Sequence, residues 1–139
     1  MELKKIAPNF AVQDISKTVT FYRDVLGFKL EMVVPEDKSG VEQELSEEKK
    51  YIYAMMSRDS VQVMFQRTDS IGEDVPPLKG VPIGASVSFY IEVDDINALY
   101  QEIKSKAEVV KELETVWYGM QEFYIKDCNS YILGFAERK

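Results

Sequence analysis

The chain repeats one pattern of secondary structure, and this internal repeat limits its possible folds more than any other feature. A strand-like run at 9–12 leads into a helix-period stretch, and a second run at 89–93 does the same. Each half then closes with a related strand, at 59–65 and at 129–135. A tandem repeat of this kind predicts two copies of one supersecondary unit.

Periodicity within each half predicts a strand, a helix and three further strands. In the first half, the expected strands are 3–12, 28–34, 51–57 and 61–68, and a helix begins at Ile15 after Asp14 and ends before Gly27. In the second half, the expected strands are 85–93, 108–111, 115–126 and 131–137, and Asp94 or Asp95 caps the helix. The Pro- and Gly-rich residues 69–84 are interpreted as a linker, and the acid-rich residues 36–48 as an inserted surface loop.

Charge and cysteine content exclude several classes of function. The 24 acidic and 17 basic residues give a net charge of −7, which argues against nucleic acid as a partner. Cys128 is the single cysteine, so no intramolecular disulfide can form. No apolar run is long enough to span a membrane, and no signal-peptide core follows the first residues. We therefore expect a cytoplasmic protein with no membrane partner.

Several motifs accompany the repeat. Each helix starts with a Val-x-Asp-Ile motif, at 12–15 and at 93–96, and a Val-Leu-Gly-Phe motif follows at 25–28. The run Gly-Met-Gln-Glu-Phe at 119–123 precedes Asp127. With these motifs the chain resembles, over residues 3–137, the vicinal-oxygen-chelate superfamily, which includes glyoxalase I, bleomycin-resistance proteins, fosfomycin-resistance enzymes and extradiol dioxygenases.

The resemblance implies an α+β fold, in which two tandem βαβββ modules form a curved mixed sheet around a cleft. The chain would then be a single domain, 1–139, made of module one (1–68), the linker 69–84 and module two (85–139). One departure is the last turn, where Asp-Cys-Asn-Ser at 127–130 replaces the family's Asp-Pro-Asp-Gly. We expect the turn to persist because asparagine tolerates left-handed backbone geometry.

Metalloenzymes of this superfamily take two metal ligands from each half, usually a histidine and a glutamate. The corresponding positions in this chain are Ala7, Met64, Ser88 and Gly134, and the sequence contains no histidine at all. These side chains cannot replace imidazole and carboxylate at a divalent ion. The resemblance therefore predicts no metal site and no cofactor, and it disfavours an enzyme, although Glu92 or Glu122 could in principle act as a base.

The same strands carry residues that suit an organic ligand. Residues that alternate with the former ligand positions face the same side of a strand, and thioethers and aromatic rings suit flat or irregular molecules. The predicted ligand-binding residues are Asn9, Met55, Gln62, Met64, Ser88, Tyr90, Trp117 and Tyr118.

Three functions are compatible with these features. The favoured one is metal-free binding of a small or drug-sized organic molecule, cationic or aromatic, as in antibiotic sequestration of the bleomycin-resistance type. The first alternative is a glyoxalase-like lyase or isomerase that acts on a small carbonyl substrate. The second is a degenerate module that acts through protein contacts. We expect a homodimer for two reasons. Pro8 lies on the expected first strand, whose edge would otherwise be exposed, and members of the resembled family commonly associate in pairs.

Overall fold

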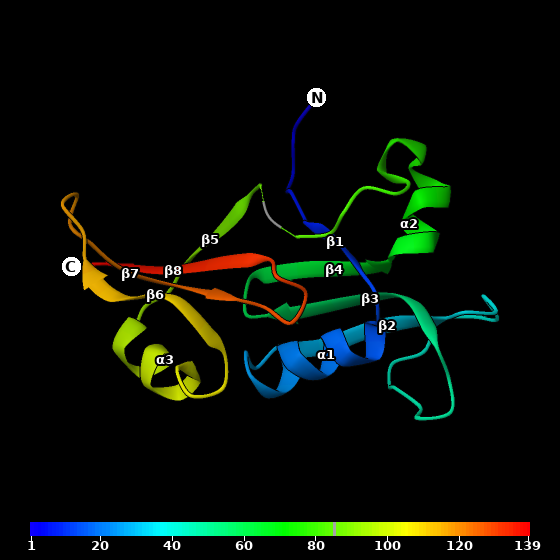
Figure 1. The fold of residues 1–139 in the computed structure, drawn as a ribbon, viewed down its shortest axis with the longest axis horizontal. Helices are drawn as coiled ribbons and strands as arrows, with labels where there is room; N and C mark the ends of the chain where they lie inside the picture. The colour runs from blue at the N-terminus through cyan, green and yellow to red at the C-terminus, as the bar shows by residue number, and fades with distance from the viewer. Residues whose placement is uncertain (85) are drawn as a thin grey trace. The chain divides into compact units, whose positions relative to one another are not determined.

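The computed structural model describes residues 1–84 and 86–139. It divides into two compact units, Met1–Pro82 and Ile83–Lys139, and each contains one four-stranded mixed sheet (Figure 1). Each unit begins with a strand and a helix and continues with three strands. The α+β class and the two tandem βαβββ modules are therefore confirmed.

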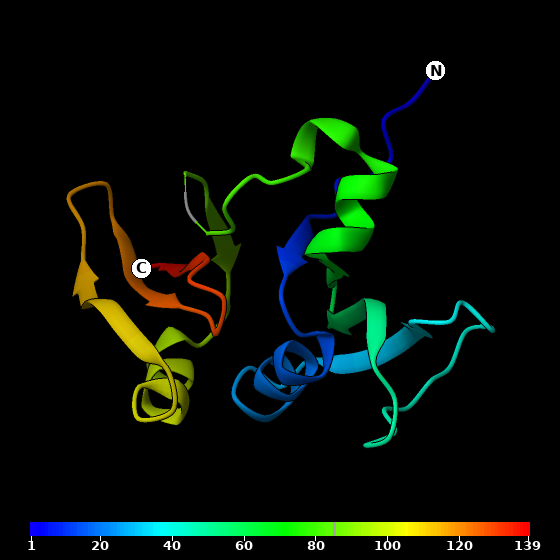
Figure 2. The same ribbon diagram turned by 45° about the vertical axis from the view of Figure 1, so that its right-hand side comes forward.

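Unit one contains seven elements of regular structure. They are β1 (Asn9–Val12), α1 (Ile15–Asp24), β2 (Lys29–Pro35), β3 (Tyr51–Arg58), β4 (Val61–Arg67), α2 (Thr68–Asp74) and the 3-10 helix η1 (Pro76–Leu78). The sheet order is β1-β4-β3-β2, with β1 parallel to β4 and the other pairs antiparallel. Figure 2 shows α1 beside this sheet and α2 continuing from the end of β4.

The ends of α1 follow from two residues that the sequence singles out. The carboxylate of Asp14 accepts a hydrogen bond from the backbone N–H of Lys17 at 3.1 Å, which caps the first turn. Gly27 adopts a φ of 70°, a left-handed conformation that suits glycine after a helix. Between these ends, Tyr22 packs its ring 4.7 Å from that of Phe65, so that α1 covers one face of the sheet.

Unit two repeats the arrangement. Its elements are β5 (Ser88–Glu92), α3 (Ile96–Ile103), β6 (Glu108–Thr115), β7 (Met120–Lys126) and β8 (Ile132–Arg138), in the sheet order β5-β8-β7-β6. Asp95 caps α3 by accepting the N–H of Ala98 at 3.1 Å. Phe123 lies 5.0 Å from Tyr100 of α3 and 5.2 Å from Phe135, which places the core between the helix and the sheet.

Three expected elements are wrong in extent. The first strand begins at Asn9 rather than at residue 3, and the residues before it are largely exposed. The expected linker 69–84 contains most of α2 and all of η1, because Ile71 and Gly72 are buried against the unit. The turn between β6 and β7 falls at 116–119 rather than at 112–114, because Gly119 adopts a φ of 86° there.

The unusual turn at 127–130 persists, but not through asparagine geometry. The buried carboxylate of Asp127 accepts the backbone N–H groups of Asn129 and Tyr131 at 2.8 and 2.9 Å. Ser130, and not Asn129, takes the left-handed conformation, with a φ of 69°. The carboxylate thus organises the turn that proline and glycine would otherwise favour.

None of the helices in the described part of the chain has the length and apolar character needed to cross a bilayer. Between β2 and β3, residues 36–50 lack regular strand pairing apart from one bridge between Val33 and Glu42. This segment contains the expected surface loop at 36–48, and most of its residues are exposed.

Candidate functional site

In each sheet, three directly paired residues form a row across the first, fourth and third strands of the unit. In unit one, Asn9 of β1 and Met55 of β3 lie on either side of Met64 of β4. In unit two, Tyr90 of β5 and Tyr124 of β7 lie on either side of Gly134 of β8. Directly paired residues share a face of a sheet, so each row forms a continuous strip.

Both rows lie on the sheet face that is turned away from the helix. Phe65, next to Met64 in β4, points to α1, and Phe123, next to Tyr124 in β7, points to α3. Neighbouring residues of a strand point to opposite faces. The row face of each unit is therefore the face that α1 or α3 does not cover.

In unit one, the row is lined by amides and thioethers. The Gln62 amide nitrogen lies 3.2 Å from the sulfur of Met55, and the Gln62 amide oxygen accepts the Lys5 ammonium at 2.6 Å. Asn9 donates to Gln66 at 3.0 Å. Gln66 in turn donates to Ser70 and Asp74 of α2, which fixes its buried amide. The predicted residues Asn9, Met55, Gln62 and Met64 thus lie together on one face.

In unit two, the row is built around a buried carboxylate. Glu122 of β7 is 1% exposed, and its Oε2 accepts the hydroxyl of Tyr118 at 2.6 Å. The hydroxyl of Tyr90 donates to the same oxygen. The predicted residues Tyr90 and Tyr118 therefore both donate to Glu122, which the sequence analysis considered only as a base.

The environment of these hydroxyls keeps them protonated. Desolvation, and then the hydrogen bond to Glu122, raise the pKa of Tyr90 far above its ordinary value of 10.0. The hydrogen bond to Glu122, followed by desolvation, raises the pKa of Tyr118. Desolvation, with a smaller contribution from the Glu122 charge, also raises the pKa of Tyr124. Tyr90 and Tyr118 thus act as fixed donors to the carboxylate.

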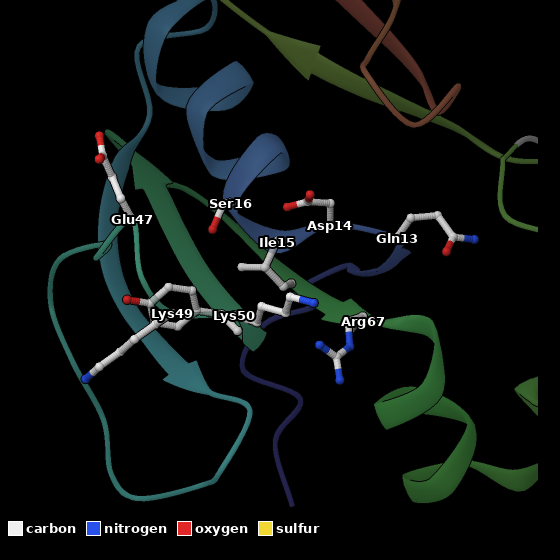
Figure 3. A pocket seen from close by; sticks show the side chains of 9 residues that line it. Gln13, Asp14, Ile15, Ser16, Glu47, Lys49, Lys50 and Arg67 are labelled. Atoms are coloured by element: carbon white, nitrogen blue, oxygen red, sulfur yellow. The ribbon is translucent and has the colours of Figure 1, made fainter.

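A separate depression of about 390 Å³ lies at the start of α1 (Figure 3). It is lined by Gln13, Asp14, Ile15, Ser16, Glu47, Lys49, Lys50, Tyr51 and Arg67. Arg67 pairs with Glu36 at 2.6 Å and with Asp69 at 2.8 Å, and Lys49 pairs with Glu42 at 2.6 Å. Two of its three cations are therefore already paired, and the carboxylate of Asp14 caps α1. None of the predicted ligand-binding residues lines it.

Comparison with known proteins agrees with this architecture. The model of the Glyoxalase/Bleomycin resistance protein/Dioxygenase superfamily matches residues 5–133. The chain belongs to this superfamily. A search of curated proteins by sequence found no significant match.

Several solved structures share the fold at low sequence identity. A protein of unknown function from Agrobacterium tumefaciens is 20% identical, with a TM-score of 0.74, covering 100% of this chain and 97% of that one. The bleomycin-binding protein of Streptomyces verticillus, solved with copper(II)-bleomycin, is 19% identical, with a TM-score of 0.64 and coverage of 100% and 99%. TioX from Micromonospora is 17% identical, with a TM-score of 0.66 and coverage of 98% and 97%.

The positions predicted to correspond to the metal ligands of superfamily enzymes are Ala7, Met64, Ser88 and Gly134. Ala7 precedes β1, and Ser88 is the exposed first residue of β5. Among residues 1–84 and 86–139, no three His, Cys, Asp or Glu side chains are grouped so that they could hold an ion. At Gly134, a Cβ atom would lie 2.4 Å from Cε2 of Tyr124. A liganding side chain at 134 would therefore collide with a ring that already lies there.

Trp117 lies beside the Glu122 cluster but makes no hydrogen bond to it in the described residues, and Ser88 is the exposed first residue of β5. Trp117 is 93% exposed in the β6–β7 turn, with its ring 5.1 Å from that of Tyr118 and perpendicular to it. Sequence reasoning missed Tyr124 and the structural role of Glu122. A signal was present, because Glu122 alternates with Met120 and Tyr124, so the strand pattern places its carboxylate between two large side chains on one face.

Proposed function

We propose that this protein binds a small organic molecule without a metal ion and without converting it chemically. The observation that carries the proposal is at Gly134, which is predicted to correspond to a superfamily metal ligand. The ring of Tyr124 leaves no room there for a side chain. Ala7, Met64 and Ser88 offer no donor that a hard or borderline divalent ion prefers. Lewis-acid catalysis of the superfamily type would lack its ligands.

The residues that remain suit recognition of an organic molecule. The face of unit one offers thioethers and amides, and that of unit two offers tyrosine rings. Polarizable sulfur and aromatic rings make favourable contacts with flat or irregular molecules. Sequestration of an antibiotic of the bleomycin type is the specific role that we propose, supported by the shared fold with a bleomycin-binding protein.

Fluorescence of Trp117, the single tryptophan, tests the proposal. Titration with metal-free bleomycin and with aromatic antibiotics, each with and without EDTA, should give saturable quenching that EDTA does not change. Binding that requires added divalent metal would contradict the proposal and favour the glyoxalase-like enzyme. No response to any probe would favour a module that acts through protein contacts.

We also propose that the protein is a homodimer in the cytoplasm. Leu3 and Ile6 support association, because their side chains are 89% and 94% exposed before β1. Pro8 lies just before β1 rather than within it, so the strand itself carries no proline at its edge. Sedimentation at micromolar concentration should give the mass of a dimer, and a single monomeric species would refute this part.

A further inference from the structure

The carboxylate of Glu122 is buried and, among residues 1–84 and 86–139, makes no ion pair with a lysine or arginine. The lysines of the same hairpin make their ion pairs with other residues, Lys111 with Glu114 at 3.1 Å and Lys126 with Glu108 at 3.8 Å. The charge of Glu122 reaches Lys111 only as a longer-range attraction that helps to raise the pKa of Lys111. A buried charge is costly unless hydrogen bonds or a counter-charge compensate for it. Here two tyrosine hydroxyls supply part of that compensation.

The direction of the hydroxyl bonds determines which ligand this cluster can accept. Tyr90 and Tyr118 each have one hydroxyl proton, and both protons point to Glu122. Only oxygen lone pairs and ring faces remain for a ligand, and the cluster contains one carboxyl group and no basic group. It cannot donate to an oxyanion, whereas a cation would meet a carboxylate, two acceptor oxygens and aromatic rings.

The rings are accessible although the carboxylate is not. Tyr90 is 46% exposed and Tyr118 is 44% exposed, while Glu122 lies beneath them at 1%. A cation placed against the rings would therefore be close to a charge that water screens poorly. Attraction to a carboxylate is strengthened where the surrounding dielectric is low, and ring faces add to it.

We propose that Glu122, Tyr90 and Tyr118 form a recognition site for an organic ammonium ion. The inference rests on the proposed function and specifies the chemical class of the ligand. The positive group of the ligand lies against the two rings, and its charge is balanced by Glu122 through the shared hydroxyls. The apolar part of such a ligand can extend along the row of Gly134 and Tyr124.

Choline and 3,3-dimethylbutan-1-ol provide a matched test, because the second replaces the quaternary nitrogen by carbon and is neutral. Trp117 fluorescence reports binding, since its ring lies 5.1 Å from that of Tyr118. Choline should quench saturably and bind at least about tenfold more tightly than the neutral analogue. Equal affinities, or no binding of choline, would overturn the inference.

Two variants test whether the carboxylate of Glu122 is responsible for choline binding. Glu122→Gln should weaken choline binding by about tenfold or more, because the charge is lost while the shape is kept. Glu112→Gln is the matched control, since Glu112 loses the same charge from an exposed position of the neighbouring strand β6. Equal effects of the two substitutions would refute a specific carboxylate site.

A third variant covers the case in which Glu122→Gln does not fold. Tyr90→Phe removes one hydroxyl and keeps a ring, and it should weaken choline binding several-fold while leaving the neutral analogue unaffected. An unchanged choline affinity in this variant would count against the site. If metal-free bleomycin binds and choline does not, the ammonium site is refuted while the proposed function stands. If neither binds, both fail.

Discussion

Gly134 is the position at which the account can be tested most sharply by substitution. Its φ lies outside the left-handed region, so the backbone itself tolerates a side chain. An added Cβ would lie 2.4 Å from Cε2, 2.9 Å from Cδ2 and 2.9 Å from Cζ of Tyr124. Because all three are ring atoms of one side chain, the whole ring must move for Gly134→Ala to fit.

The expected change in the free energy of unfolding is the difference between two opposing contributions. Forcing an extra methyl into a packed position costs about 1–3 kcal/mol. Replacing glycine within a strand returns about 0.5–1 kcal/mol of backbone entropy. We therefore expect Gly134→Ala to destabilise the protein by about 1–2 kcal/mol, which lowers Tm by roughly 3–7 °C for a chain of this size.

A double-mutant cycle isolates the contact with Tyr124. In a Tyr124→Ala background the ring is absent, so Gly134→Ala should be neutral or slightly stabilising. Urea denaturation of the four proteins gives the coupling, which we expect to be about 1–3 kcal/mol. Equal effects of Gly134→Ala in both backgrounds would show that the ring does not occupy this position, and the argument for a closed metal-ligand site would fail.

Further predictions concern ionisation and local stability. In an alkaline titration followed at the phenolate absorbance, Tyr90, Tyr118 and Tyr124 should ionise above their ordinary pKa of 10.0, and Glu122→Gln should move this late fraction to lower pH. Because the folded-state pKa values of these tyrosines are raised, their contribution to stability is present below pH 10 and is lost as the pH rises through the folded-state values. If the tyrosines of Glu122→Gln titrate at the same pH as those of the unsubstituted protein, the hydrogen-bonded cluster is contradicted. Asp14→Ala should cost about 1 kcal/mol in urea denaturation through loss of the α1 cap, whereas Asp24→Ala, at the last residue of the same helix, should cost less. Asp127→Ala should cost about 1–3 kcal/mol, because the N–H groups of Asn129 and Tyr131 lose their acceptor, and a smaller loss would argue against the role of this carboxylate in the turn.

The repeat made most of the fold predictable. Apolar spacing and the two aspartate caps identify α1 and α3, and the alternating runs identify all eight strands, because these signals are local. The missed helix α2 lies in a Pro- and Gly-containing stretch, and its burial depends on Ile71 packing on its unit. The position of the β6–β7 turn depends on Gly119, which strand periodicity alone does not reveal.

The candidate site was predictable only in part. Alternation placed Asn9, Gln62 and Met64 on the same side, and the structure brings them together with Met55. The hydrogen bond between Tyr90 and Glu122 joins residues 32 positions apart in the sequence. They come together because β5 pairs with β8 and β8 pairs with β7, which no local sequence pattern encodes. The same applies to the ring of Tyr124 over Gly134, which depends on a cross-strand register.

Native mass spectrometry of the purified protein with metal-free bleomycin, in the presence of EDTA, tests the central proposal most directly. The account predicts a complex whose mass equals protein plus intact bleomycin, with no metal retained and no product released on incubation. A complex that forms only after a divalent metal is supplied, or a bound molecule whose mass has changed, would contradict it.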